Sequence, residues 1–89
     1  MQHSLFAPAT TVTFTDSEFA QLRKPWVKDF GAVAFLERLL ERIDRNGVAE
    51  FTDAELRKCY HFGYEISSNG GPQSRLRTIV AAARRAGWE

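Results

Sequence analysis

The sequence has a single cysteine, Cys59, and no hydrophobic run of the length that a membrane-spanning helix needs. One cysteine excludes an internal disulfide and fits a reducing compartment, so we expect a cytoplasmic protein without membrane contact. The first residues have no basic segment followed by an apolar one, so we expect no signal peptide. Glycine and proline are not enriched, with 6 and 3 copies, which excludes a collagen-like or low-complexity chain.

The composition is that of an ordinary globular domain. Hydrophobic residues make up 44% of the 89 positions and charged residues 26%, enough for one modest core and too little for two. The first ten residues carry Pro8 and show little periodicity, so we expect a flexible N-terminal tail over 1–10 and a single domain over 11–89. The predicted fold is mainly α, an α+β arrangement with a short two-stranded β element.

The charge is unevenly distributed along the chain. Residues 1–56 hold six basic and nine acidic residues, a net charge of −3, whereas residues 57–89 hold six basic and two acidic ones, a net charge of +4. A clustered positive surface attracts phosphate whatever the overall charge of the protein. The asymmetry therefore favours an anionic partner, although an arginine-rich solvated helix face would give the same count.

Two segments have the pattern of a strand followed by a capped helix. Residues 11–14 are β-branched or aromatic with alternating apolar positions, and in 15–18 a threonine stands three residues before a glutamate, as in a capping box. This predicts a strand over 11–14 and a helix over about 16–23. The same pattern recurs at 48–51 and 52–55 and predicts a strand and a helix over 53–62, which should stop near Gly63 and carry Leu56, Cys59 and Tyr60 inward. We attribute the recurrence to shared capping chemistry and not to a solenoid repeat.

The helical periodicity is strongest between Trp26 and Arg45. Apolar residues recur there at steps of three and four, which predicts the main core helix, ended by Asn46 and Gly47. Turn-forming residues predict a loop over 65–72, and a last helix is expected from 73 or 74 to Ala86, with Gly87 as its terminator. The residues predicted to face the core from the first of these helices are Phe30, Val33, Leu36, Leu39, Leu40 and Ile43.

On the last helix, five residues share one face and are predicted to point into the core: Leu76, Ile79, Val80, Ala83 and Gly87. The opposite face is expected to carry small residues, among them Ala81 and Ala82, bordered by arginines. Small residues with basic borders suit a helix that enters a DNA groove while its edges reach phosphates. The alternatives are contact with a protein partner and an idle surface.

The order helix, strand, capped helix, loop and basic helix over about residues 30–88 resembles the start of winged helix-turn-helix domains. Residues 68–77, followed by 84–88, are similar to the recognition-helix segment of small winged-helix modules in restriction enzymes and phage proteins. The resemblance implies a helix-turn-helix over 53–86, but Gly87 is followed by two residues and the second wing is missing. The nucleic-acid-binding residues that it implies are Asn69, Gln73, Ser74, Arg75, Arg77, Thr78, Arg84 and Arg85.

Other chemistry finds little support in the sequence. Residues 44–55 have the spacing of an EF-hand calcium loop, but Val48 and Ala49 stand where an oxygen ligand and a glycine are needed. Cys59 and His61 lie two residues apart on a predicted helix, so their side chains point away from each other. No zinc-ligand cluster, P-loop or dinucleotide fingerprint is present. We therefore expect no enzyme activity, metal, cofactor or small-molecule substrate.

These patterns predict a small DNA-binding protein of bacterial or phage type, acting on double-stranded DNA as a regulator or as a subunit of a larger nucleoprotein complex. The missing wing makes a homodimer attractive. The alternative is a protein-binding inhibitor or adaptor, such as a phage-encoded anti-CRISPR or anti-restriction protein, that uses the same basic surface with Phe62, Tyr64 and Trp88. Salt dependence separates the two, because phosphate binding weakens steeply with salt and an apolar interface does not.

Overall fold

Four α-helices and one two-stranded sheet make up the part of the chain that the structure describes, a computed structural model covering residues 9–25, 33–65 and 71–89. The described part is therefore a mainly helical α+β fold, as predicted. The elements in chain order are β1 (Ala9–Thr13), α1 (Asp16–Arg23), α2 (Val33–Glu41), β2 (Val48–Thr52), α3 (Asp53–Tyr60), the π-helical turn η2 (His61–Glu65) and α4 (Gly71–Arg85).

The two strands pair with each other in antiparallel register, with Thr10 opposite Phe51 and Val12 opposite Ala49. This confirms the two-stranded β element. The strand β1 begins earlier than the sequence predicted, because Ala9 and Thr10 are already paired with β2. The predicted tail was wrong for these two residues, and the rest of it, residues 1–8, lies outside the described residues.

Both predicted capping boxes are present, and they make the same set of hydrogen bonds. Thr15 and Thr52 are the N-caps of α1 and α3, and each side chain accepts the N–H of the glutamate three residues later. Each glutamate in turn accepts the N–H of its threonine, at 2.8 Å in both cases. Two orphan amides are satisfied at each helix start, so the residue types fix both boundaries locally.

The helix predicted over 26–45 is shorter at its C-terminal end, since α2 ends at Glu41. The carboxylate of Asp44 accepts the N–H groups of Asn46 at 2.8 Å and Val48 at 3.0 Å, which offers the backbone a turn in place of another helical step. Gly47 completes that turn with a φ of +78°, a conformation that glycine adopts at low cost. Residues 26–32 of the prediction lie outside the described residues.

Two further boundaries differ from the prediction. The helix expected to stop near Gly63 continues as η2 to Glu65, and a Cβ on Gly63 would lie only 3.3 Å from Cγ of Arg77. Gly63 therefore allows close approach to α4 and does not end the helix. The helix α4 begins at Gly71, inside the predicted loop, because Pro72 is tolerated in the first turn, where its missing N–H costs nothing. Residues 66–70 of that loop lie outside the described residues.

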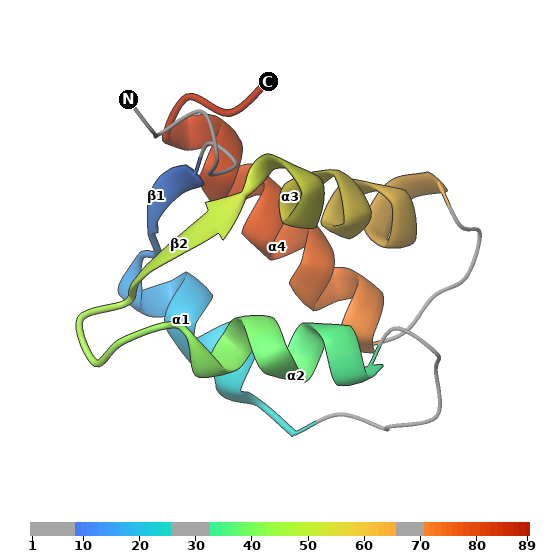
Figure 1. Cartoon of the computed structure of the whole chain (residues 1–89). Helices are drawn as coiled ribbons and strands as arrows, with labels where there is room; N and C mark the ends of the chain where they lie inside the picture. Colours follow the sequence, from blue (N-terminus) through green and yellow to red (C-terminus); the bar gives the residue numbers. More distant parts are fainter. Residues whose placement is uncertain (1–8, 26–32, 66–70) are drawn as a thin grey trace.

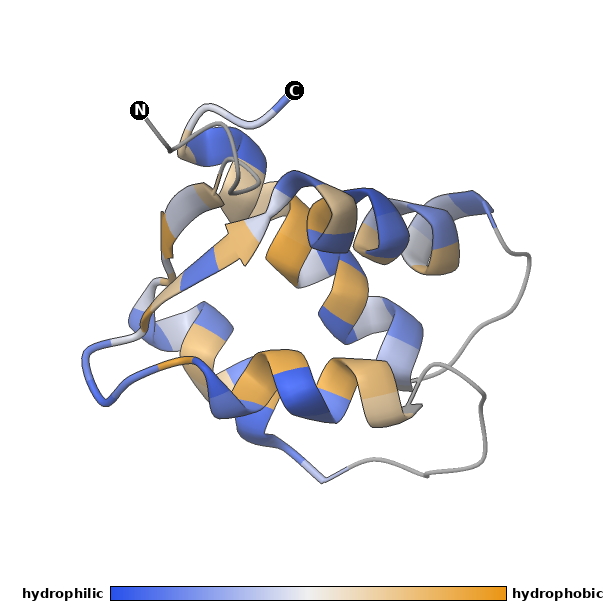
Figure 2. Cartoon of the chain, in the orientation of Figure 1, coloured by the Kyte–Doolittle hydropathy of each residue, from blue (hydrophilic) through white to orange (hydrophobic). Residues whose placement is uncertain are grey.

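The core surrounds α4, which passes between α3 and α2 and lies beside the sheet (Figure 1). Figure 2 shows hydrophobic and polar residues alternating along the helices and the two strands. Leu76, Ile79, Val80 and Ala83 of α4, predicted to face inward, are all completely buried. Gly87, predicted to face inward with them, is exposed, because α4 ends at Arg85 and Gly87 belongs to the turn that follows. Leu36 and Leu39 of α2 and Leu56 of α3 are buried with them, as predicted. Within the described ranges, no helix is long and apolar enough to cross a membrane.

Candidate nucleic-acid interface

The exposed side of α4 is narrower than the sequence predicted. Ala82 is 1% exposed and Gln73 is 7% exposed, so both belong to the interior and not to the outer face. The helix contacts the sheet and each of the other helices, which covers more than half of its circumference. The described residues of α4 that remain exposed are Ser74, Arg77, Ala81, Arg84 and Arg85, and Thr78, which lies among them, is half-buried. We call these six residues the α4 stripe.

Arg75 is the largest departure from the predicted site. Its side chain is 4% exposed, and Nη2 donates a hydrogen bond of 2.7 Å to the carbonyl oxygen of Lys24. Lys24 is the C-cap of α1, where helix carbonyls lack intrahelical partners and carry partial negative charge. Burial lowers the pKa of Arg75 from its ordinary value. Helical periodicity placed Arg75 on the border of the outer face because it could not anticipate this carbonyl.

Arg85 is exposed, but its charge is matched by a neighbouring helix. Nη2 lies 2.7 Å from Oε1 of Glu18 and also donates to the carbonyl oxygen of Thr13. The hydrogen bond from Arg85 holds the pKa of Glu18 below its ordinary value and raises that of Arg85. Arg85 therefore joins α4 to β1 and α1 and offers less free charge to a ligand than its exposure suggests.

Arg77 and Arg84 lie on the other border of the α4 stripe, against aromatic rings of α3 and η2. The Cζ atom of Arg77 lies 5.6 Å from the ring centre of Tyr64, and that of Arg84 lies 5.2 Å from the ring centre of Tyr60. The two tyrosine rings stack at 5.0 Å with an interplanar angle of 28°. Together these four side chains form a row that we call the Arg–Tyr row.

The charges of the Arg–Tyr row are not neutralised within the described part of the chain. Arg77 Nε donates to the carbonyl oxygen of Gly63, and neither Arg77 nor Arg84 has a carboxylate partner among the described residues. The two arginines are seven positions apart, so they lie about 10 Å from each other along the helix axis. Cation–π contact and the carbonyl bond hold the guanidinium groups in place without cancelling their charge.

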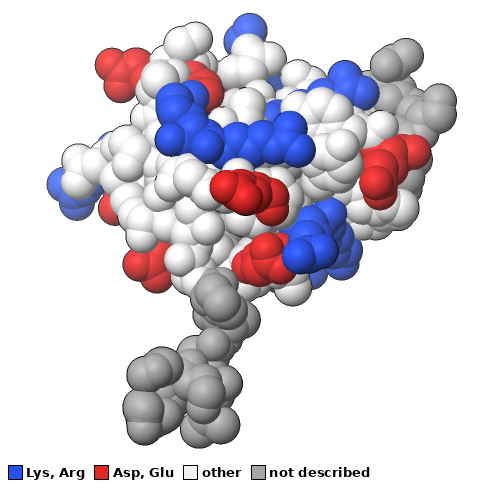
Figure 3. All heavy atoms as spheres, turned by 90° about the horizontal axis from the view of Figure 1, so that it is seen from above, with Lys and Arg blue, Asp and Glu red and all other residues white. Residues whose placement is uncertain are grey.

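Figure 3 shows a band of basic side chains on the face seen from above, with acidic side chains beside it. Basic side chains outside α4 already have contacts within the protein. Arg57 Nε lies 2.6 Å from Oδ2 of Asp53. Lys58 Nζ lies 4.5 Å from the ring centre of Phe35 and, like the two arginines of the Arg–Tyr row, has no carboxylate partner among the described residues. The positive charge that the sequence predicted for the second half therefore narrows, among the described residues, to Lys58, Arg77 and Arg84.

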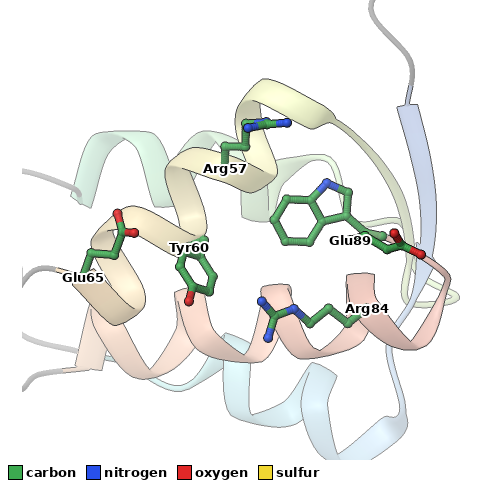
Figure 4. Close-up of a pocket in the computed structure, with 6 residues that line it drawn as sticks. Arg57, Tyr60, Glu65, Arg84 and Glu89 are labelled. Carbon is green, nitrogen blue, oxygen red and sulfur yellow. The ribbon is translucent and has the colours of Figure 1, made fainter.

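An open pocket of about 330 Å³ adjoins the row. Figure 4 shows Tyr60 reaching down from α3 toward α4, while Arg57 and Arg84 approach from opposite sides. Trp88 lines the same pocket, and Glu65 and Glu89 supply carboxylates at its edge. Trp88 is placed by the end of α4: Gly87 has a φ of +108°, and the N–H of Trp88 donates to the carbonyl oxygen of Ala83 at 3.0 Å.

The remaining predicted residues are placed as follows. Ser74 is exposed, and Thr78 Oγ1 donates to the carbonyl oxygen of Ser74 at 3.0 Å, so both lie on the α4 stripe. Asn69 lies outside the described residues. The stacking of Tyr60 on Tyr64 was not predicted from the sequence, although their four-residue separation on a helical segment was the signal for it.

Cys59 and His61 have separate environments, as predicted. Cys59 is completely buried, and burial raises the pKa of its thiol to about 12, so the thiolate nucleophile is suppressed. His61 is on the surface, where Nδ1 lies 2.9 Å from Oε1 of Glu65. Among residues 9–25, 33–65 and 71–89, no group of three or more potential metal ligands comes together.

No family model matches the chain, and no curated protein or solved structure has significant similarity to it. Any proposal about its function therefore rests on the arrangement of its own side chains.

Proposed function

We propose that this protein binds double-stranded DNA through the α4 stripe, as a helix-turn-helix module of winged-helix type that serves as a regulator or as a subunit of a nucleoprotein complex. The observation that carries the proposal is the pair Arg77 and Arg84, exposed two helical turns apart without a carboxylate partner among the described residues. Positive groups held in fixed positions contact phosphates at low entropic cost.

The residues between these arginines and Arg85 suit close approach to a groove. Ser74, Thr78 and Ala81 are small. The hydroxyl group of Ser74 can donate to or accept from base edges and phosphates, whereas that of Thr78, which donates to the carbonyl oxygen of Ser74, can accept. Arg77 and Arg84 on one border would then contact one phosphate chain. Arg85 on the other border would contribute less, because Glu18 already neutralises it.

The chain order also supports a winged-helix-type arrangement. The helix α2 is followed by β2, α3 and α4, which is the order of such a domain, and α3 packs directly on α4. The strand β1 pairs with β2, and we propose that it stands in for the missing wing strand.

The test is fluorescence anisotropy with a labelled duplex of about 16 base pairs, at several salt concentrations. We expect wild-type protein to bind at 50 mM salt with a Kd below about 10 μM, in the range of weak non-specific binders or better. Replacing both Arg77 and Arg84 by Gln should lower the salt slope by about two, since each lost phosphate contact removes about 0.9.

The matched control is Arg38→Gln with Arg45→Gln, which removes the same charge from two exposed residues outside α4. If the control double variant weakens binding as much as the α4 double variant, the α4 stripe is not the contact surface. If wild-type protein shows no duplex binding, or binding that salt leaves unchanged, the proposal is wrong. A protein partner then becomes the better account of the same arginines and tyrosines.

A further inference from the structure

The pocket beside the Arg–Tyr row has features that phosphate contact alone does not use. Its walls are aromatic and charged: Tyr60 and Trp88 supply ring surface, Arg57 and Arg84 supply guanidinium groups, and Glu65 and Glu89 supply carboxylates. Because Arg84 belongs both to the α4 stripe and to this pocket, a strand lying on α4 passes its opening.

The tryptophan wall of the pocket is held in a fixed position. Trp88 Nε1 donates to Oδ1 of Asp53 at 2.9 Å, and the other carboxylate oxygen of Asp53 accepts from Arg57. The glycine-based end of α4 sets the backbone of Trp88, as described above. An aromatic ring fixed at both its backbone and its polar edge loses little freedom when a ligand stacks on it.

The tyrosine wall is equally constrained. Tyr60 is half-buried and stacks on Tyr64, and Arg84 lies over its ring. The ring of Tyr60 is therefore already in contact with two flat groups, and the surfaces left for a base to stack on are the guanidinium of Arg84 and the indole of Trp88, both held in place before a ligand arrives. Its volume of about 330 Å³ is at the lower end of small-molecule sites, which are about 300–1,000 Å³, and suits one planar ring system and not a larger ligand.

The carboxylates decide which part of a nucleotide fits. Glu65 and Glu89 would repel a phosphate, but each can accept a hydrogen bond from the exocyclic amino group of adenine, cytosine or guanine. Thymine has no such amino group. Base stacking on aromatic and guanidinium planes is the usual way in which proteins hold unpaired bases. The chemistry of the pocket therefore matches the base and leaves the phosphate to Arg84 at its edge.

We propose that this pocket binds one unpaired, amino-bearing nucleobase from a strand that continues beyond the duplex on α4. The proposal rests on the proposed function and deepens it, because it makes a duplex with a single-stranded end the preferred ligand. An overhang of adenine or cytosine should bind more tightly than a blunt end, and an overhang of thymine should gain less.

The experiment uses two DNA hairpins that share one stem, one blunt and one with a three-nucleotide adenine overhang. The protein carries Trp26→Phe, which leaves Trp88 as the sole tryptophan of the chain. We expect the overhang to bind about tenfold more tightly and to quench Trp88 emission, as stacking of one base predicts. Equal affinity for both hairpins with unchanged Trp88 emission would overturn the nucleobase pocket.

Variants at the pocket sharpen the result. Trp88→Leu should remove the advantage of the overhang and keep the affinity for the blunt hairpin. Since Trp88 packs on the core and could be needed for folding, Trp88→Phe is the second variant. It retains a ring and should keep most of the advantage. An advantage that survives Trp88→Leu in a folded protein would contradict the proposal.

The same titrations separate failure of the pocket from failure of the proposed function. Salt-dependent binding of the blunt hairpin without any gain from the overhang keeps duplex binding and rejects the pocket. Quenching by the overhang strand alone, with no blunt binding, keeps the pocket and rejects duplex binding. Free adenosine monophosphate is the last arm. If it quenches Trp88 at the same concentration as the overhang, the ligand is a free nucleotide and the strand-end proposal is wrong.

Discussion

On the side of α4 that faces β1 and α1, the arginines complete the protein's own structure. Arg75 is buried against the carbonyl of Lys24, and Arg85 is paired with Glu18. On the side that faces α3 and η2, Arg77 and Arg84 lie over tyrosine rings and keep their charge available. Arginine thus has two roles on this helix: it either stabilises the fold or keeps its charge available to a ligand. The role depends on whether a carbonyl or carboxylate group that can neutralise the guanidinium lies within reach on a neighbouring element.

The largest loss of stability is expected from the core residues of α4, which lie beneath both sides of the helix. Leu76 lies between Arg75 and Arg77 and is completely buried. Leu76→Ala should lower the free energy of unfolding by about 2–5 kcal/mol, because it removes buried methyl groups and leaves a cavity. Urea unfolding followed by circular dichroism measures it. A loss below about 0.5 kcal/mol would mean that the buried face of α4 is misplaced.

The two sides should then respond differently to loss of an arginine. Arg75→Ala removes a charged hydrogen bond and the packing of a buried side chain, so we expect a loss of about 1.5–3 kcal/mol in the free energy of unfolding. Arg77→Ala removes an exposed side chain and should cost at most about 1 kcal/mol. The same urea titrations compare them, and the distinction fails if Arg77→Ala costs as much as Arg75→Ala.

Acid should have a smaller effect on stability, through the pair between Glu18 and Arg85 on the side of α4 that faces α1. The Arg85 hydrogen bond lowers the pKa of Glu18, so the unfolded chain binds that proton more readily than the folded protein. The stabilisation is therefore fully present above about pH 4.5, the ordinary value, and is lost as pH falls through the lowered pKa of the folded state. Thermal unfolding between pH 6 and pH 3 measures the loss.

Glu18→Gln should reduce this acid sensitivity while keeping the side-chain oxygen that caps α1. Some sensitivity will remain, because Arg42 lowers the pKa of Glu55 in the same way. The control is Glu41→Gln, an exposed residue of α2. If both variants lose stability in acid as steeply as the wild type, the pair between Glu18 and Arg85 does not contribute.

What could be predicted from the sequence follows the same division between local and distant causes. The capping boxes at Thr15 and Thr52 were correct to the residue, because every atom involved lies within four positions of the cap. The buried stripe of α4 was also correct, since periodicity alone determines it. The partner of Arg75, by contrast, is the end of a helix 51 residues away, and no local pattern indicates it.

The candidate site was predictable in part for the same reason. Arg77 and Arg84 were identified from their place on the helix, but the rings that hold them come from α3 and η2. The sequence suggested that Gly63 would end a helix, whereas Gly63 allows η2 to approach α4 and so brings Tyr64 beside Arg77. Glycine has both uses, and only the packing of another element distinguishes them.

We propose that DNA contacts α4 mainly through Arg77 and Arg84, on the side that faces α3 and η2, and that Arg75 and Arg85, on the side that faces α1, contribute little. The most direct measurement is an NMR titration of the arginine Nε–H signals with a duplex of about 16 base pairs. We expect the signals of Arg77 and Arg84 to shift on binding, while those of Arg75 and Arg85 stay in place. Shifts confined to Arg75 and Arg85, or no shift at any of the four, would contradict the account.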